Sequence, residues 1–274
     1  MSKINKIGVI GLGQMGRPMS KHLIAKGFQV FGCDPSQEAC GKALGLGVRM
    51  VDSPGAVAAA SDLSIVIVGF DSEVEAVLFG ERGIAASAKP GHIVAVASTV
   101  TPGYAMQLAG RLAARGVVLL DAPLARGEQA AIDGKLLVFG AGEPGAFETC
   151  RPAFETFASP VHYLGAAGAG HVGKMVNNLI LWACTSATDE GLRLGAALGV
   201  DPERMRHALH DSSAQNWSMD NRAEDSKMPW AEKDMMIVLS EADRLRISLP
   251  LCGTIKETIK DLKIRRGFPM PGAK

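Results

Sequence analysis

Residues Lys6 to Asp34 read KIGVIGLGQMGRPMSKHLIAKGFQVFGCD and decide the fold. A short apolar run, Lys6 to Ile10, leads into a glycine-rich turn and a helical pattern that continues through Lys26. A second apolar run follows, from Gln29 to Cys33. This order of strand, glycine turn, helix and strand predicts the first unit of an α/β fold with a parallel sheet.

The glycine turn has glycine at its first, third and sixth positions, Gly11, Gly13 and Gly16, and Gln14 and Met15 between the last two. Glycines at this spacing permit a tight turn, a close approach of the backbone to a pyrophosphate, and close packing of the helix on the strand. The open N–H groups at the start of the helix also favour phosphates. We therefore expect these five residues to bind a dinucleotide cofactor.

Asp34 ends the second predicted strand, where a carboxylate can accept hydrogen bonds from both ribose hydroxyls of the adenosine. A carboxylate repels a 2′-phosphate, and the following Pro35 and Ser36 offer no arginine to hold one. The sequence thus favours NAD over NADP. The competing interpretation, in which Asp34 only caps the next helix, leaves the glycine turn without a ligand.

The rest of the N-terminal half continues the alternation of strands and helices, including a predicted helix from Gly103 to Arg115. Further strands are predicted at Ser64–Val68, His92–Ala97, Val117–Leu120 and Leu136–Gly140. This pattern predicts a mostly parallel, doubly wound sheet, in which ligands bind beyond the carboxyl ends of the strands.

The C-terminal part reads as helical. A long helix is predicted from about Ala169 to Gly199, and Asp201 and Pro202 form the start of the next one. Further helices are predicted at Lys233–Arg246 and Leu251–Ile264. We expect two domains, residues 1–164 for the cofactor and residues 165–274 for substrate and dimerisation.

Composition limits the alternatives. The 274 residues carry a formal net charge of +1, with 47% hydrophobic and 21% charged residues, which is ordinary for a globular protein and gives no reason to invoke nucleic acid or a membrane surface. The five cysteines lack any CxxC pair, and neither a signal peptide nor an apolar run long enough for a membrane span is found. The histidines show no ligand spacing, so no metal is proposed, and we expect a cytoplasmic protein.

Five motifs, in order, resemble the β-hydroxyacid dehydrogenase family, which includes 3-hydroxyisobutyrate dehydrogenase and tartronate semialdehyde reductase. They are GLGQMGRPM (Gly11 to Met19), ASTVTP (Ala97 to Pro102), DAPLARGEQAAIDGKL (Asp121 to Leu136), GAAGAGHVGKMVNN (Gly165 to Asn178) and the pair Lys233-Asp234. The resemblance covers nearly the whole chain.

The resemblance implies an N-terminal Rossmann domain joined through a long helix to an all-α domain, in a homodimer or homotetramer. It implies reversible hydride transfer between nicotinamide and a small anionic hydroxyacid or semialdehyde, with Lys174 matching the catalytic lysine. Asn178 matches a substrate-binding amide, and Lys233 matches a lysine that faces the closed cleft, beside substrate and cofactor. Phe70, Ser98 and Thr99 fall in the loops that the resemblance places along the cofactor.

Lysine suits this chemistry because its pKa can be lowered by burial and by the positive charge of oxidised nicotinamide, so that it can accept or return the hydroxyl proton. If Lys174 lies on a helix, Asn178 at i+4 shares its face. His171, one turn earlier, is an alternative base that the family match does not include.

The substrate segment departs from the family. Where relatives usually have Ser-Gly-Gly, this chain has Ala125, Arg126 and Gly127. We hypothesise that the guanidinium of Arg126 clamps an acidic group of the substrate, the alternative being that Arg126 turns outward to solvent. Two other functions stay open: an imine reductase-like enzyme, whose members usually lack this lysine, and a catalytically silent NAD-binding module.

Overall fold

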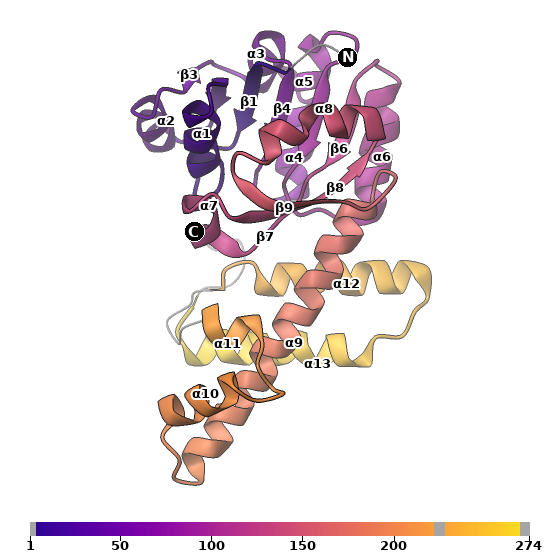
Figure 1. Ribbon diagram of the computed structural model, residues 1–274. Coiled ribbons are helices and arrows are strands. Elements are labelled where there is room, and N and C mark those ends of the chain that lie inside the picture. Colours follow the sequence, from indigo (N-terminus) through magenta and orange to yellow (C-terminus); the bar gives the residue numbers. More distant parts are fainter. Residues whose placement is uncertain (1–3, 222–227, 269–274) are drawn as a thin grey trace. The chain divides into compact units, whose positions relative to one another are not determined.

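The computed structural model describes residues 4–221 and 228–268, and the chain divides into two compact units, Met1–Lys174 and Met175–Lys274. The first unit is an α/β domain and the second is helical. One long helix, α9 (Ala169–Ala197), begins in the first unit and continues into the second (Figure 1). The predicted fold class is confirmed, whereas a boundary at residue 165 stays a prediction, since α9 crosses between the units.

Six strands of the first unit form a parallel sheet in the order β3-β2-β1-β4-β5-β6. Their bounds are β1 (Lys6–Ile10), β2 (Gln29–Cys33), β3 (Arg49–Met50), β4 (Leu63–Val66), β5 (Ile93–Val96) and β6 (Val118–Asp121). Beyond β6 the sheet continues with β8 (Leu136–Gly142), antiparallel to β6 and to β7 (Leu124–Ala125) and parallel to β9 (Ala158–Tyr163). The parallel strands all end at one edge, which is where ligands bind in such sheets.

Helices cover both faces of this sheet (Figure 1). They are α1 (Gly16–Ala25), α2 (Gln37–Leu44), α3 (Pro54–Ala60), α4 (Asp71–Phe79), α5 (Ile84–Ser87), α6 (Pro102–Ala113), α7 (Gly127–Ile132) and α8 (Pro144–Phe154). The alternation of β5 shows why: Ile93 and Ala95 belong to one hydrophobic core, and Val94 and Val96 to the other. A strand buried on both faces is a continuous apolar run, as this one is.

The predicted elements agree with the structure to within a few residues. The first two predicted strands have the predicted bounds. The third ends at Val66 and not at Val68, because the N–H of Val68 donates to the Ser98 side chain and no longer to a strand. The last runs on to Gly142, since its end pairs with β6.

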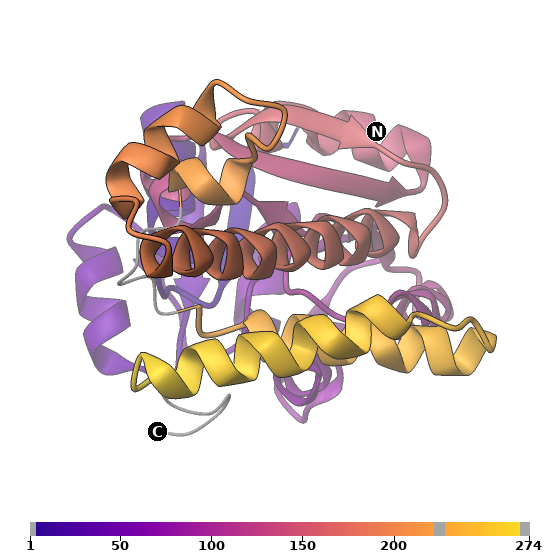
Figure 2. The ribbon, with the colours of Figure 1, turned by 90° about the horizontal axis from the view of Figure 1, so that it is seen from below.

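The second unit contains the rest of α9 and four shorter helices, α10 (Pro202–His210), α11 (Trp217–Asn221), α12 (Ala231–Leu245) and α13 (Pro250–Arg265). Asp201 caps α10 as predicted, accepting a hydrogen bond from Arg204 N at 2.9 Å. Helices α12 and α13 lie side by side (Figures 1 and 2). Trp182 of α9 packs in the same core and donates from Nε1 to Asp234 Oδ2 at 2.9 Å, which ties α9 to α12.

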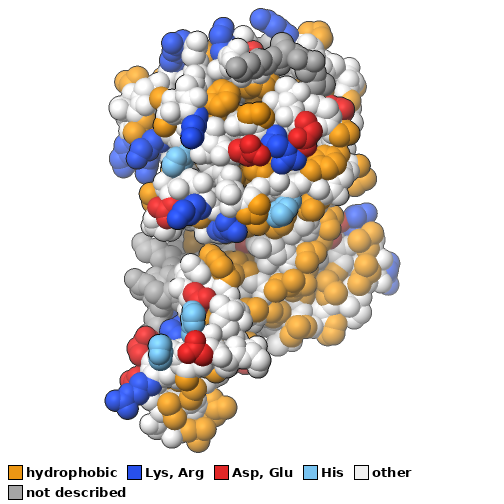
Figure 3. All heavy atoms as spheres, viewed as in Figure 1, with side chains coloured by type: hydrophobic (Ala, Val, Ile, Leu, Met, Phe, Trp, Pro, Cys, Tyr) orange, Lys and Arg blue, Asp and Glu red, His pale blue; other side chains and the backbone are white. Residues whose placement is uncertain are grey.

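Hydrophobic side chains gather on the surface of the α12–α13 hairpin (Figure 3). Exposed apolar residues there include Met236, Leu245, Ile247 and Leu251. Across residues 4–221 and 228–268, no helix has the length and hydropathy that a membrane span requires. A contiguous exposed apolar surface of this kind is typical of a protein–protein contact.

Candidate active site

The glycine turn after β1 is shaped by backbone contacts. Gly11 has φ +96°, and a Cβ there would lie 2.1 Å from the carbonyl oxygen of Ile67. A Cβ on Gly16 would lie 1.9 Å from the carbonyl oxygen of Gly11. A Cβ on Gly13, in contrast, would have no heavy atom of the protein within 4 Å. Gly11 and Gly16 are therefore required by the turn itself, while Gly13 leaves open space in which a pyrophosphate fits at the N-terminus of α1.

Asp34 is tied to this turn. Its Oδ2 accepts a hydrogen bond from Leu12 N at 2.7 Å, and its Oδ1 accepts one from Ser36 N at 2.8 Å. The cap of α2 is Ser36, whose Oγ accepts from Ala39 N. The interpretation of Asp34 as only a helix cap is therefore wrong. Each carboxylate oxygen keeps further acceptor capacity for a ribose hydroxyl.

The loops after β4 and β5 are joined by Ser98. Its side chain is buried, and Oγ accepts a hydrogen bond from Val68 N at 2.7 Å. In the loop after β4, the backbone N–H groups of Gly69 and Phe70 both donate to Glu73 Oε2, at 2.7 and 3.1 Å. Phe70 and the neighbouring Thr99 are half-buried at the ligand-binding edge. Ser98 thus shapes the backbone of this edge, and its predicted contact with the cofactor stays a prediction.

The substrate segment begins with Ala125, which is buried at the end of β7. Arg126 follows with a left-handed backbone, φ +84°, and Gly127 has φ +78°. The exposed Arg126 side chain folds back, and Nη1 donates to the carbonyl oxygens of Ser159 at 2.8 Å and Lys135 at 3.2 Å. Within residues 4–221 and 228–268, no partner is found for its Nε or Nη2, so an anion could still be bound there.

Lys174 and Asn178 lie on α9, four residues apart and therefore on one face, as predicted. Lys174 is half-buried, while Asn178 is buried and its Oδ1 accepts from Asn177 Nδ2 at 3.1 Å. Lys233 belongs to the second unit, where its Nζ lies 5.6 Å from the centroid of the Trp230 ring.

Asp121, the last residue of β6, is a residue to which sequence reasoning gave no role of its own. Its Oδ2 accepts hydrogen bonds from Gly168 N at 2.7 Å and Gly170 N at 3.1 Å. Oδ1 lies 3.9 Å from Nε2 of His171, and both side chains are fully buried. The available signal was the position of a carboxylate at the end of an apolar strand, which is rare unless the carboxylate is paired.

Burial sets the charges of this pair. It raises the pKa of the Asp121 carboxyl from 3.8 to about 6, partly offset by the N–H groups of Gly168, Gly170 and His171. Burial also lowers the pKa of His171 from 6.5 to about 3. At neutral pH the imidazole is therefore uncharged, and the 3.9 Å approach is not an ion pair. Among the described residues, neither ring nitrogen nor Oδ1 has a hydrogen-bond partner.

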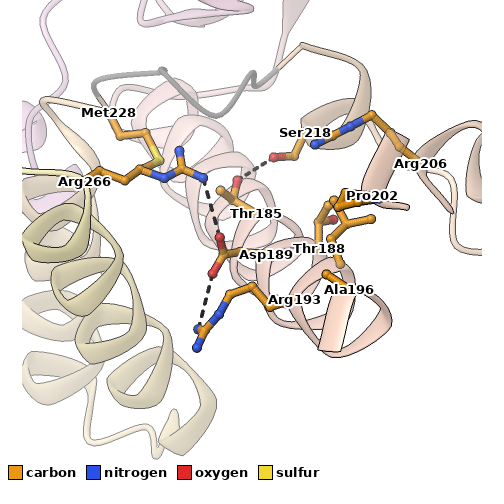
Figure 4. Close-up of a pocket in the computed structure, with 11 residues that line it drawn as sticks. Thr185, Thr188, Asp189, Arg193, Ala196, Pro202, Arg206, Ser218, Met228 and Arg266 are labelled. Atoms are coloured by element: carbon orange, nitrogen blue, oxygen red, sulfur yellow. Dashed lines mark hydrogen bonds and ion pairs between the residues drawn. The ribbon is translucent and has the colours of Figure 1, made fainter. Parts of the chain in front are cut away.

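A separate cavity of about 180 Å³ lies in the helical unit (Figure 4). No predicted site residue lines it. The guanidinium groups of Arg193 and Arg266 approach the carboxylate of Asp189 at 3.8 and 3.5 Å, and Arg265 also donates to it. An ion-pair cluster thus lies along this cavity. In the part of the chain that the structure describes, no group of three or more His, Cys, Asp or Glu side chains could hold a metal ion.

Comparisons with known proteins agree with this geometry. Residues 6–165 match the family described as the NAD-binding domain of 6-phosphogluconate dehydrogenase. Residues 168–267 match the family described as the NAD-binding region of NADP-dependent 3-hydroxyisobutyrate dehydrogenase.

Individual relatives cover most of the chain. L-threonate dehydrogenase of Cupriavidus necator is 33% identical over 255 residues, which are 89% of this chain and 86% of that protein. 2-(Hydroxymethyl)glutarate dehydrogenase of Eubacterium barkeri is 31% identical and covers 82% of this chain and 74% of its own length. The crystal structure of 3-hydroxyisobutyrate dehydrogenase from Salmonella typhimurium has a TM-score of 0.84 at 28% identity and covers 93% of both chains.

The doubly wound sheet with this glycine turn is typical of nicotinamide-binding domains, and the matches over most of the chain place the protein among the NAD(P)-dependent hydroxyacid dehydrogenases. The chain belongs to the β-hydroxyacid dehydrogenase family.

Replacement of Asp121 by Asn should change how stability depends on pH. The carboxyl has a pKa of 3.8 when unfolded and about 6 when folded, so unfolding between these values releases a proton. The stabilisation by the protonated acid is complete below the lower pKa and is lost as pH rises through the upper one. Because Asn carries no such proton, the variant should gain about 3 kcal/mol relative to wild type between about pH 3.5 and 7.

Urea unfolding of both proteins across this pH range measures the difference in their free energies of unfolding. His171 is present in both proteins, so its titration largely cancels in that difference. A difference that does not vary with pH would show that Asp121 titrates like an exposed acid.

Proposed function

We propose that this protein is an NAD-dependent dehydrogenase that interconverts a small β-hydroxyacid and its semialdehyde or keto acid, with Lys174 as the general acid–base. The observation that carries the proposal is the start of α9. Asp121 Oδ2 holds Gly168 and Gly170 at the carboxyl end of β6, so Lys174, one turn further on, belongs to the ligand-binding edge.

Lys174 suits the proton transfer. The nicotinamide, when bound, accepts hydride from the hydroxyl-bearing carbon or returns it. In the oxidation direction, neutral Lys174 takes the hydroxyl proton, and in the reduction direction its ammonium group returns that proton to the forming alcohol. Asn178, on the same face of α9, can donate from its amide to the substrate and so orient it.

NAD is favoured over NADP by Asp34. Its carboxylate is fixed by Leu12 N and Ser36 N, so it cannot easily swing away from a 2′-phosphate. A fixed negative charge accepts hydrogen bonds from two ribose hydroxyls and repels a phosphate in the same place.

The substrate is proposed to be anionic, because the relatives are named for the hydroxyacids L-threonate and 2-(hydroxymethyl)glutarate. Nε and Nη2 of Arg126, which have no partner among the described residues, support a contact with an acidic group of the substrate beyond the reacting carbon. Ala125 and Gly127 flank this contact, and Lys233 is proposed as a further residue that binds substrate and cofactor. The exposed apolar surface of the α12–α13 hairpin supports self-association into a homodimer or homotetramer. We also propose that the protein is cytoplasmic.

Gly13→Ala tests the cofactor site without disturbing the fold. The new methyl group would meet no protein atom within 4 Å, so the melting temperature should stay close to that of the wild type. It would occupy the space proposed for the pyrophosphate, and the Kd of NADH should rise at least about tenfold. Fluorescence titration measures the Kd, and Gly16→Ala, whose methyl group meets backbone, should fail to fold. An unchanged Kd for folded Gly13→Ala would place the cofactor elsewhere.

Lys174→Ala tests the function. The variant should fold and bind NADH while losing at least about a hundredfold in kcat, the scale of a general acid–base group. Turnover is measured with NAD(H) and NADP(H) against L-threonate, 3-hydroxyisobutyrate, 2-(hydroxymethyl)glutarate, tartronate semialdehyde and sulfolactaldehyde. The exposed Lys89→Ala serves as the control and should keep full activity. Retained activity in Lys174→Ala would exclude its role, and a wild-type protein that binds NADH but turns over no substrate would favour a silent module.

Arg126→Gly tests the substrate clamp. Glycine accepts the left-handed backbone of residue 126 without strain, so the variant removes the guanidinium alone. The KM of the best substrate should rise at least about tenfold, the scale of one charge-assisted hydrogen bond, with a smaller change in the KM of NAD. An unchanged KM for the substrate would mean that Arg126 serves only the carbonyl groups of Ser159 and Lys135.

A further inference from the structure

We propose that Asp121, together with His171, is a positioning residue for Lys174: its buried carboxylate fixes the first turn of α9 against the end of β6 and thereby sets where the lysine points. The inference rests on the proposed role of Lys174 and adds a residue that never touches the substrate. It follows from four sets of contacts, all within the first unit.

The sheet fixes the backbone of Asp121 on both sides. In the strand register, Asp121 pairs with Val96 of β5 and with Ala141 of β8. Its side chain is fully buried, and its orientation is restrained by the hydrogen bonds that Oδ2 accepts from Gly168 N and Gly170 N. A carboxylate held this way fixes the position, relative to the sheet, of the N–H groups that donate to it.

What it binds is the start of α9. The first N–H groups of a helix have no partner within the helix and need an acceptor. Asp121 Oδ2 supplies this acceptor to Gly168 N and Gly170 N, from 47 and 49 residues away in the chain. The cap of the helix that carries Lys174 thus comes from the sheet, and it fixes the helix start in three dimensions.

The glycines of the GAGHVGK run allow the helix to come this close. A Cβ on Gly170 would lie 2.4 Å from the carbonyl oxygen of Phe139 and 2.7 Å from Asp121 Cβ. A Cβ on Gly173 would lie 2.5 Å from Leu164 Cδ1. The residue before Lys174 is therefore itself in close contact with the sheet domain, and glycine spacing here serves helix-to-sheet contact.

His171 adds a second buried side chain to the first turn of α9. It lies three residues before Lys174, hence on the same side of α9, and its fully buried ring faces Asp121 Oδ1 at 3.9 Å. A change in the Asp121 side chain would therefore move the turn that holds both His171 and Lys174. Because effective proton transfer depends on placement within a fraction of an ångström, the expected consequence is a loss in kcat.

Asp121→Ala and a matched control, Glu143→Ala, separate positioning from stability. Glu143 caps α8 in the same unit, accepting from Gly145 N at 2.9 Å and from Ala146 N, and has no part in the proposed site. Both variants should lower the melting temperature. Only Asp121→Ala should lower kcat at least about tenfold, with the KM of NAD changed less than about twofold, since the glycine turn is untouched.

Asp121→Asn provides the rescue. The amide oxygen still accepts from Gly168 N and Gly170 N, so kcat should stay within about threefold of the wild type. If Asp121→Ala cannot be obtained folded, Asp121→Asn decides: a loss of more than about tenfold would show that the charge matters and not the cap, and would overturn the proposal. Equal losses of kcat in Asp121→Ala and Glu143→Ala would overturn it as well.

Hydrogen exchange distinguishes a failed positioning role from a failed assignment of function. Exchange of the backbone amides of residues 165–178 is measured in all three variants without any substrate. Faster exchange there in Asp121→Ala, but not in Glu143→Ala or Asp121→Asn, supports the anchor even for a protein that turns over no hydroxyacid. Unchanged exchange in Asp121→Ala would overturn the anchor whatever the activity.

Discussion

Backbone-to-backbone approach that leaves no room for a Cβ is the constraint on which the first unit depends. It occurs at Gly11 and Gly16, where the turn after β1 meets the end of β4 and itself, and again at Gly170, where α9 meets Phe139. The first contact brings the N-terminus of α1 to the ligand-binding edge of the sheet, and the second brings the start of α9 there. Both helix starts lie at the same edge of the sheet because both approaches are close.

The elements of the sheet could be predicted because each is a local pattern. Apolar runs such as Ile93 to Val96 are buried on both faces and need no knowledge of their neighbours to be recognised. The antiparallel end of the sheet is different. The pairing of β8 with β6 joins Asp121 to Ala141, and no periodicity in either run indicates the direction of that pairing. Strand β4 ends at Val66, two residues before the predicted end, because the N–H of Val68 donates to the side chain of Ser98 in another loop.

The candidate site could be predicted only as far as its residues lie in recognisable motifs. Gly11 to Gly16 and Lys174 to Asn178 are short segments whose spacing alone places them on a turn and on a helix face. Asp121 is the first residue of the DAPLARGEQAAIDGKL motif, yet only the structure shows that its carboxylate accepts hydrogen bonds from Gly168 N and Gly170 N. A hydrogen bond that spans 47 residues depends on the whole fold: a carboxylate at the end of an apolar strand indicates that it has a partner, but not which residue that partner is. The same holds for Trp182 and Asp234, which are joined across 52 residues.

Arg126 departs from the family pattern at a position whose left-handed backbone favours glycine. The position has φ +84°, which suits the glycine of relatives and costs a residue with a Cβ about 1 kcal/mol. The hydrogen bonds from Nη1 to the carbonyl oxygens of Ser159 and Lys135 offset that cost. The exposed guanidinium is thereby held against the loop by the carbonyl groups of Ser159 and Lys135.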